Sequence, residues 1–126
     1  MTGGLVGLGI DSVDIERFGR VLARRPAMAI RLFTTGEQSY AATLKNPLPS
    51  LAARFAVKEA VMKALGVGLG AFDWADVEVA RLSGGAPKLM VSGRAASLAS
   101  ERGISGWHVS ITHTDTVASA AVVATS

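Results

Sequence analysis

The strongest helical segment of this chain is LAARFAVKEAVMKALG, residues 51–66. Alanine, leucine, methionine and lysine dominate it, and all four favour the α-helix. Ser50 can cap its start, and Gly66 is a natural stop. Large apolar side chains fall on two nearly opposite flanks of its helical wheel: Leu51, Phe55 and Met62 on one, Val57 and Val61 on the other. We therefore expect a helix that is buried on more than one side.

Between those flanks lies a narrow sector of small residues with one acid–base pair, namely Ala52, Ala56, Glu59, Lys63 and Gly66. One interpretation is a solvent-exposed Glu59–Lys63 pair at i,i+4 spacing, which contributes about 0.2–0.5 kcal/mol. An exposed strip is more often filled by long polar residues, however, and small neighbours leave room around the two charges. The sector therefore favours a groove for a polar ligand.

Upstream, residues 5–13 (LVGLGIDSV) are expected to form a strand. One side of this strand carries Val6, Leu8 and Ile10, and the other carries Leu5, Gly7, Gly9 and Asp11. The two glycines leave the second side bare, which lets something approach the backbone closely. An aspartate near a strand end is often a cap or a turn anchor, but Asp14 is the better cap here, so Asp11 is a candidate for binding.

The other elements follow from periodicity and turn residues. We expect a helix from Asp14 to Pro26, a shorter one from a Thr35–Gln38 capping box to about Leu44, a hairpin of strands 76–81 and 88–92, a helix over 93–103, and a final strand pair at 107–114 and 116–124. The order β-α-α-α-ββ-α-ββ predicts an α+β fold in which an antiparallel sheet packs against helices. A single domain over residues 1–126 is expected.

Composition excludes several classes of protein. With 126 residues, 49% hydrophobic and 18% charged, the chain is neither disordered nor collagen-like. It has no cysteine, which rules out disulfides and thiolate metal sites. No stretch approaches the roughly 18 consecutive apolar residues of a membrane span, and no basic segment precedes the first apolar residues. We expect a cytoplasmic protein with no membrane partner.

The net charge of +3 is unevenly placed, because residues 1–63 hold nine basic and five acidic residues. Arg17, Arg20 and Arg24 form a stripe opposite the apolar face of the first expected helix. This stripe is either an ordinary solvated face or a docking surface for an acidic partner. No run of Lys and Arg exceeds two residues and only seven residues are aromatic, so we do not expect nucleic acid to be that partner.

The carboxylates of Asp11 and Glu59, with Lys63 one turn beyond Glu59, suit a Mg²⁺ ion that carries phosphate oxygens. Mg²⁺ prefers oxygen ligands, keeps several waters and usually takes one or two protein carboxylates. A cluster of Ser110, His113 and Thr114 could hydrogen-bond a phosphate. From the residues alone, a metal-dependent phosphohydrolase or nucleotidyl transferase and a non-catalytic basic binding module remain alternatives.

Three blocks of sequence are decisive: LGIDSVDI at 8–15, RFAVKEAVMKALG at 54–66 and HVSITHT at 108–114. Together they closely resemble the stand-alone holo-acyl-carrier-protein synthases, the small bacterial 4′-phosphopantetheinyl transferases. That family is marked by a G-x-D motif followed later by aromatic-x-x-K-E-x-x-x-K, and here the two motifs place Asp11 and Glu59 48 positions apart. The resemblance covers nearly the whole chain in order and length.

The resemblance implies transfer of the 4′-phosphopantetheine group of coenzyme A to a serine of an apo-acyl carrier protein or carrier domain, with release of 3′,5′-ADP. Mg²⁺, or Mn²⁺, is the implied cofactor, Asp11 and Glu59 match its ligands, and Lys63 completes the expected catalytic set. The expected coenzyme A contacts are Asp11, Arg54, Lys58, Glu59, Lys63, Gly66, Ser110, His113 and Thr114.

Similar proteins dock an acidic carrier on helix arginines, which match Arg17 and Arg24 here, with Arg20 between them. They also form homotrimers whose active sites lie between subunits, so we expect the same assembly. Where the family has a Gly-Lys-Pro turn, this chain has Gly85-Ala86-Pro87. The lysine of that turn is therefore missing, and neighbouring Lys88 is the candidate to replace it.

Overall fold

A three-stranded antiparallel sheet in the order β1-β5-β4 packs on one long helix, α4. The computed structural model describes residues 3–81 and 84–126. In chain order the elements are β1 (Leu5–Asp14), α1 (Ile15–Arg24), α2 (Ala27–Leu32), α3 (Thr35–Ala42), α4 (Leu48–Leu65), the 3₁₀ helix η1 (Trp74–Asp76), β2 (Val77–Arg81), β3 (Pro87–Val91), α5 (Gly93–Glu101), β4 (Gly106–His113) and β5 (Val117–Thr125).

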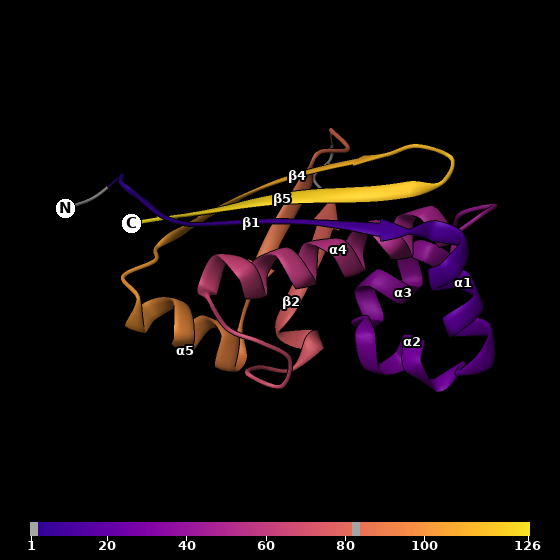
Figure 1. The fold of residues 1–126 in the computed structure, drawn as a ribbon, viewed down its shortest axis with the longest axis horizontal. Coiled ribbons are helices and arrows are strands. Elements are labelled where there is room, and N and C mark those ends of the chain that lie inside the picture. Colours follow the sequence, from indigo (N-terminus) through magenta and orange to yellow (C-terminus); the bar gives the residue numbers. More distant parts are fainter. Residues whose placement is uncertain (1–2, 82–83) are drawn as a thin grey trace.

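Figure 1 shows the three-stranded sheet as one layer, with α4 beneath it and α1, α2 and α3 grouped around one end of α4. Strands β2 and β3 form a separate antiparallel pair. The fold is thus the predicted α+β arrangement of an antiparallel sheet packed against helices. None of the helices in the described part of the chain combines the length and the apolar character that a membrane crossing requires.

Glycines let β1 lie directly on α4. A Cβ atom at Gly9 would stand only 1.8 Å from the carbonyl oxygen of Ala60, and one at Gly7 only 2.1 Å from that of Ala64. Real Cβ atoms never come that close to a backbone oxygen, so any side chain here would push the strand off the helix. The bare side of β1 therefore accommodates α4 over Gly7 and Gly9, and only its far end, at Asp11, is left for a ligand.

The small residues of α4 also serve packing. Ala52 and Ala56 are fully buried, each 0% exposed, and belong to the hydrophobic core. Alternate residues of β5 (Ala118, Ala120, Val122 and Ala124) are buried with them, as strand periodicity requires. The predicted ligand groove along the small-residue sector is therefore wrong at Ala52 and Ala56: close helix–sheet packing occupies that space.

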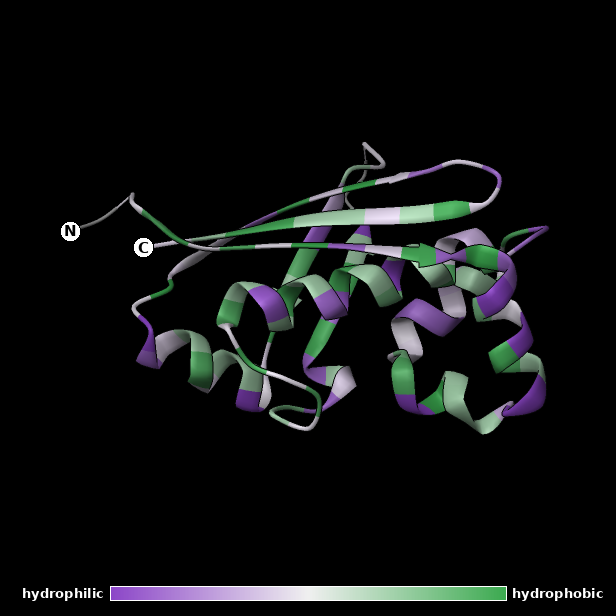
Figure 2. Ribbon diagram, in the orientation of Figure 1, coloured by the Kyte–Doolittle hydropathy of each residue, from purple (hydrophilic) through white to green (hydrophobic). Residues whose placement is uncertain are grey.

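The outer face of the sheet is apolar and exposed along β1, whereas β4 contributes polar residues to it, among them Ser110 and Thr112. Leu8 and Ile10 on β1 are 61% and 64% exposed. They pair across the ladder with Val123 and Ala121 of β5. Figure 2 shows that β5 is largely hydrophobic along its length, whereas the β4–β5 turn is hydrophilic. A face of this kind on a folded domain marks an interaction surface.

Local caps were predicted with mixed success. The Asp14 carboxylate accepts a hydrogen bond from the Arg17 backbone N–H at 3.0 Å and caps α1, as expected. Gly66 ends α4 with a left-handed φ of 70°. The capping box of α3 is Thr34–Glu37, one residue earlier than the predicted Thr35–Gln38.

Helix α4 begins earlier than expected, and one helix was missed. Its first residue is Leu48, with Pro47 at the N-cap, so Ser50 is inside the helix and is not its cap. Helix α2, six residues long, follows Pro26, which was interpreted only as a helix stop or bend. Proline fits the start of a helix as well as its end, because its missing N–H has no partner there anyway.

Candidate functional site

A cleft of about 980 Å³ opens where β1, α1, α2, α4 and the segment after α4 meet. We call it the carboxylate cleft, because its lining includes Asp11, Asp14, Glu59 and Asp73. One wall is a row of aromatic rings: the centroids of Phe18 and Phe55 lie 5.1 Å apart, and those of Phe55 and Trp74 lie 5.4 Å apart. The cleft thus combines anionic oxygens with an apolar surface.

Asp11 and Glu59 reach this cleft from β1 and α4, 48 residues apart in sequence. Burial raises the pKa of the Glu59 carboxyl above its ordinary value, the negative charge of Asp11 raises it further, and Lys63 partly opposes both effects. Because the charge of Asp11 raises the pKa of Glu59, the two carboxylates are close enough to interact electrostatically. The structure therefore brings together the two acidic residues that the sequence singled out.

Lys63 lies beside this pair of carboxylates. Its Nζ lies 3.1 Å from the Asp11 Oδ1 atom and donates a hydrogen bond of 2.9 Å to the carbonyl oxygen of Ile10. The side chain is half exposed and does not itself line the carboxylate cleft. Gly66, expected near coenzyme A, lies less than one turn beyond Lys63 and is exposed.

The donor set suits a hard divalent cation. No group of three or more His, Cys, Asp or Glu side chains in residues 3–81 and 84–126 is arranged to hold a metal. Two carboxylates are nevertheless what Mg²⁺ usually takes from a protein, the remaining positions being filled by water and substrate phosphate. The pKa of Glu59 is raised because the positive charge near its carboxylate does not fully compensate the burial of that group. Asp11 and Glu59 therefore fit Mg²⁺.

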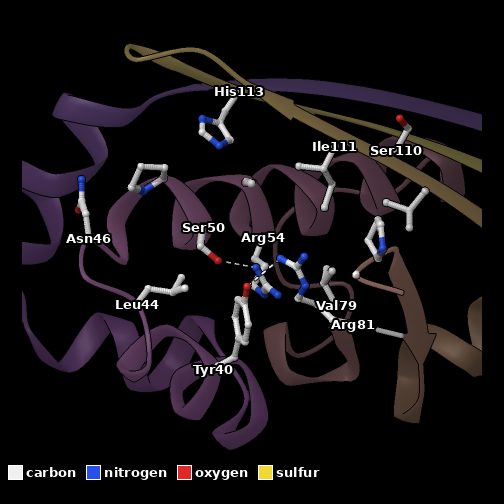
Figure 3. A pocket seen from close by; sticks show the side chains of 15 residues that line it. Tyr40, Leu44, Asn46, Ser50, Arg54, Val79, Arg81, Ser110, Ile111 and His113 are labelled. Carbon is white, nitrogen blue, oxygen red and sulfur yellow. Dashed lines mark hydrogen bonds between the residues drawn. The ribbon is translucent and has the colours of Figure 1, made fainter. Parts of the chain in front are cut away.

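A second cleft, of about 500 Å³, lies among α3, α4, the β2–β3 hairpin and β4 (Figure 3). We call it the arginine cleft, after Arg54 and Arg81. Arg54 is buried, donates a hydrogen bond to the Ser50 Oγ atom and stacks over the Tyr40 ring, with its Cζ atom 4.8 Å from the centroid. Burial lowers the pKa of its guanidinium below the ordinary value. Within one chain, Arg54 and Glu59 therefore serve different clefts.

The three residues of the predicted phosphate cluster, Ser110, His113 and Thr114, differ in where their side chains lie. Ser110 pairs with Ala121 and faces the outer side of the sheet, while His113 pairs with Ala118 and faces the inner side. Both residues contribute to the lining of the arginine cleft, and Figure 3 shows the His113 ring directed toward it. Thr114 uses its Oγ1 atom to accept the backbone N–H groups of Thr116 and Val117, at 3.2 and 3.1 Å, in the β4–β5 turn.

Lys58 has a role different from the expected contact with coenzyme A. Its side chain is 0% exposed, and its Nζ lies 2.9 Å from the Oε1 atom of Glu37, which is also fully buried. The same ammonium donates hydrogen bonds to the carbonyl oxygens of Trp74 and Val77. All donors of Lys58 are thus directed at protein groups, and the structure does not support the predicted ligand contact.

The three arginines of the stripe on α1 differ in their contacts. Arg17 lines the carboxylate cleft. The Nη1 atom of Arg20 lies 2.8 Å from the Glu16 carboxylate in an exposed i,i+4 pair, and Arg24 is exposed in the last turn. Sequence reasoning missed Arg31, which lines the same cleft from α2. It was missed because α2 was not predicted.

A family model and many curated proteins match this chain. A model of the 4′-phosphopantetheinyl transferase superfamily matches residues 7–121. The holo-[acyl-carrier-protein] synthase of Streptomyces griseus is 48% identical over 120 residues, which are 95% of this chain and 98% of that protein.

Solved structures show the same fold. The crystal structure of holo-[acyl-carrier-protein] synthase from Neisseria meningitidis superimposes with a TM-score of 0.88 at 30% identity and covers 96% of this chain and 98% of its own. The Bacillus anthracis enzyme in complex with coenzyme A (3′,5′-ADP) gives 0.81 at 33% identity, with 97% of each chain covered. With these matches over nearly its full length, the chain belongs to the 4′-phosphopantetheinyl transferase superfamily, among the holo-[acyl-carrier-protein] synthases.

Proposed function

We propose that this chain transfers the 4′-phosphopantetheine group of coenzyme A to a serine of an apo-acyl carrier protein or carrier domain. The serine oxygen forms a bond to the β-phosphorus of coenzyme A, the bond from that phosphorus to the bridging oxygen breaks, and 3′,5′-ADP leaves. The serine proton passes to a base. The observation that carries this proposal is the meeting of Asp11 and Glu59 in one cleft beside Lys63.

Each residue has a separate task in this reaction. Asp11 and Glu59 would hold Mg²⁺ (or Mn²⁺), which when bound neutralises charge on the diphosphate. Glu59 accepts the serine proton, directly or through a water molecule, since its raised pKa makes it a better base than an ordinary carboxylate. Lys63, with its ammonium beside Asp11, stabilises charge on the leaving side of the diphosphate.

A direct test is to incubate the protein with coenzyme A, Mg²⁺ and an apo-carrier protein and to weigh the carrier by mass spectrometry. We expect the carrier to gain one phosphopantetheine group on a serine. Hydrolysis of coenzyme A with an unmodified carrier would favour a phosphohydrolase instead. No reaction, combined with steeply salt-dependent binding to nucleic acid, would favour a basic binding module.

We further propose that the active protein is a homotrimer with sites between subunits. Two observations support this assembly. The expected coenzyme A contacts of one chain are divided between the carboxylate cleft and the arginine cleft, and the outer face of the sheet exposes Leu8 and Ile10. Burying this face against further copies would cover the apolar surface and bring the carboxylate cleft of one copy toward the arginine cleft of the next.

Light scattering tests the assembly. Ile10→Glu is expected to give folded monomers with little transfer activity, because it places a charge on the apolar sheet face. Ile30→Glu is the matched control, since Ile30 is similarly exposed (70%) but lies on α2, away from the sheet. A wild-type monomer that is fully active, or an Ile10→Glu trimer, would contradict the proposal.

Arg17, Arg20 and Arg24 are proposed to dock the acidic carrier. Arg17→Ala and Arg24→Ala should each raise KM for the carrier and leave kcat nearly unchanged, because rim charges act mainly on encounter and orientation. Added salt should reduce the difference from wild type by screening the same charges. Arg102→Ala, at the C-cap of α5, is the control. An unchanged KM for the carrier at low salt would exclude this docking surface.

A further inference from the structure

An ammonium group is buried in the helix that serves both clefts. Lys58 lies on α4 between Phe55 and Glu59, both of which line the carboxylate cleft, but its own side chain is fully buried and lines neither cleft. Replacing a buried ion pair by apolar side chains of similar size is often neutral or stabilising, so stability alone gives little reason for a lysine at this position. The groups that Lys58 holds point to another role.

The Lys58 ammonium joins three elements to α4. It lies 2.9 Å from the Oε1 atom of Glu37 on α3, and it donates a hydrogen bond of 3.0 Å to the carbonyl oxygen of Trp74 in η1. It donates another to the carbonyl oxygen of Val77 in β2. Because a lysine ammonium has three N–H donors, these contacts use all of them. The ends of α3, η1 and β2 are thereby fixed against one turn of α4.

Glu37 and Trp74 depend on Lys58 to different degrees. The Glu37 carboxylate also accepts the backbone N–H groups of Thr34 and Val79, each at 3.0 Å, so other bonds hold it in place. The Trp74 carbonyl accepts one further hydrogen bond, from the Val77 N–H within its own turn. Lys58 is therefore the donor that links this carbonyl to α4.

Trp74 is also the residue of η1 whose ring belongs to the wall of the carboxylate cleft. Its ring lies over that of Phe55, with centroids 5.4 Å apart and planes inclined by 30°. Phe55 precedes Glu59 by four positions, so the two are neighbours on one face of α4. A shift of η1 away from α4 would move the Trp74 ring and open the wall beside Glu59.

We propose that Lys58 is a positioning residue for the transfer reaction: by holding the Trp74 carbonyl against α4, it sets the aromatic wall of the carboxylate cleft beside Glu59. This inference rests on the proposed function. A displacement of about 1 Å at a reacting centre can cost roughly 100-fold in rate. The groups that line such a centre must therefore be held by packing and by hydrogen bonds behind them, which the buried Lys58 supplies.

The position of Trp74 can be measured without substrate. The chain has two tryptophans, so Trp107→Phe leaves Trp74 as its one indole fluorophore. In that background, Glu37→Gln keeps the Lys58 N–H donors for both carbonyls, whereas Lys58→Met/Glu37→Gln removes them and leaves no unpaired charge. We expect the emission of the second variant to shift to the red and to be quenched more strongly by acrylamide. Glu37→Gln should resemble its parent.

The kinetic test uses the same pair of variants at a temperature at which the melting curves show both to be folded. Lys58→Met/Glu37→Gln should lower kcat by about 10- to 100-fold relative to Glu37→Gln, the effect of misplaced groups at a reacting centre. KM for coenzyme A should change less, because Trp74 does not line the arginine cleft. Should the variant not fold, Lys58→Gln/Glu37→Gln, in which the two amides can pair with each other, takes its place.

Two further variants separate positioning from lost stability. Trp74→Ala should lower kcat by a similar factor, and adding Lys58→Met/Glu37→Gln to it should cost nothing more, because both changes disrupt the same wall. Val61→Ala is the matched control: it removes fully buried volume from α4 without touching either cleft, so its kcat should equal that of wild type.

Three results would overturn the inference: unchanged Trp74 emission on loss of Lys58, equal losses of kcat in that variant and in Val61→Ala, or losses from Lys58 and Trp74 that multiply. The fluorescence measurement needs no coenzyme A and no carrier, so it tests Lys58 even if transfer fails. A wild-type protein that binds coenzyme A but never modifies a carrier would instead overturn the proposed function.

Discussion

Glu59→Gln is expected to lower the rate of phosphopantetheine transfer by about 10²- to 10⁴-fold, the usual contribution of a positioned general base. The amide keeps the size of the side chain but cannot take the serine proton. It is also a weaker ligand for a divalent cation than a carboxylate. The measurement is the initial rate of carrier modification by mass spectrometry at saturating coenzyme A and Mg²⁺.

The same substitution should not unfold the protein. Burial and the neighbouring charge of Asp11 raise the pKa of Glu59, so its ionised form is less favourable in the folded chain than in the unfolded chain. Removing that charge should keep or raise the melting temperature at neutral pH, where the ionised form would otherwise be present. Glu101→Gln, at an exposed position of α5, controls for a simple loss of surface charge.

Asp11→Asn distinguishes the two carboxylates. It should shift the Mg²⁺ concentration needed for half-maximal rate upward, because Asp11 is proposed as a ligand and not as the base. Near-normal turnover of Glu59→Gln, or of Asp11→Asn with normal dependence on Mg²⁺, would refute these roles. A loss of rate accompanied by an equal loss of folded protein would be attributed to structure, and the melting curves separate that case.

Lys58→Met is expected to destabilise the fold by about 3–5 kcal/mol, the usual result of removing one partner of a buried ion pair. The substitution leaves the Glu37 carboxylate buried without its countercharge. It also removes the donor to the carbonyl oxygens of Trp74 and Val77. Urea unfolding at one fixed protein concentration measures the effect, since assembly makes stability depend on concentration.

Two variants make this prediction specific. The double variant Lys58→Met/Glu37→Gln should recover part of the loss, because no unpaired charge then remains in the core. Lys88→Met, which removes an exposed lysine, should change stability little. If Lys58 contacted coenzyme A as the sequence suggested, Lys58→Met would weaken ligand binding and leave stability unchanged. That outcome would contradict the buried pair.

Errors in the predicted fold arose where two local signals were equally good. Thr34–Glu37 and Thr35–Gln38 both fit the capping-box pattern, and only the folded chain shows that the first is used. Glu37 is held there by a contact beyond α3: its Oε2 atom accepts a hydrogen bond from the backbone N–H of Val79, at 3.0 Å. A residue 42 positions away thus favours one register over the other.

The candidate site was predicted in part. Asp11, Glu59 and Lys63 were identified from the sequence, and the structure brings them together. Arg81 and Tyr40 were not identified, because nothing in their local sequence distinguishes them from ordinary surface residues. Their relation exists only through the approach of α3 to the β2–β3 hairpin.

The sequence by itself determined most of the helices and strands and the chemical groups available to them, because caps, turns and side-chain periodicity depend on neighbours a few residues apart. The tertiary structure decided which of those groups are used, and for what. It packed Gly7 and Gly9 against α4, enclosed Lys58 with Glu37, and placed Arg54 in a different cleft from Glu59. Such outcomes depend on burial and on contacts between distant residues, which no local pattern encodes.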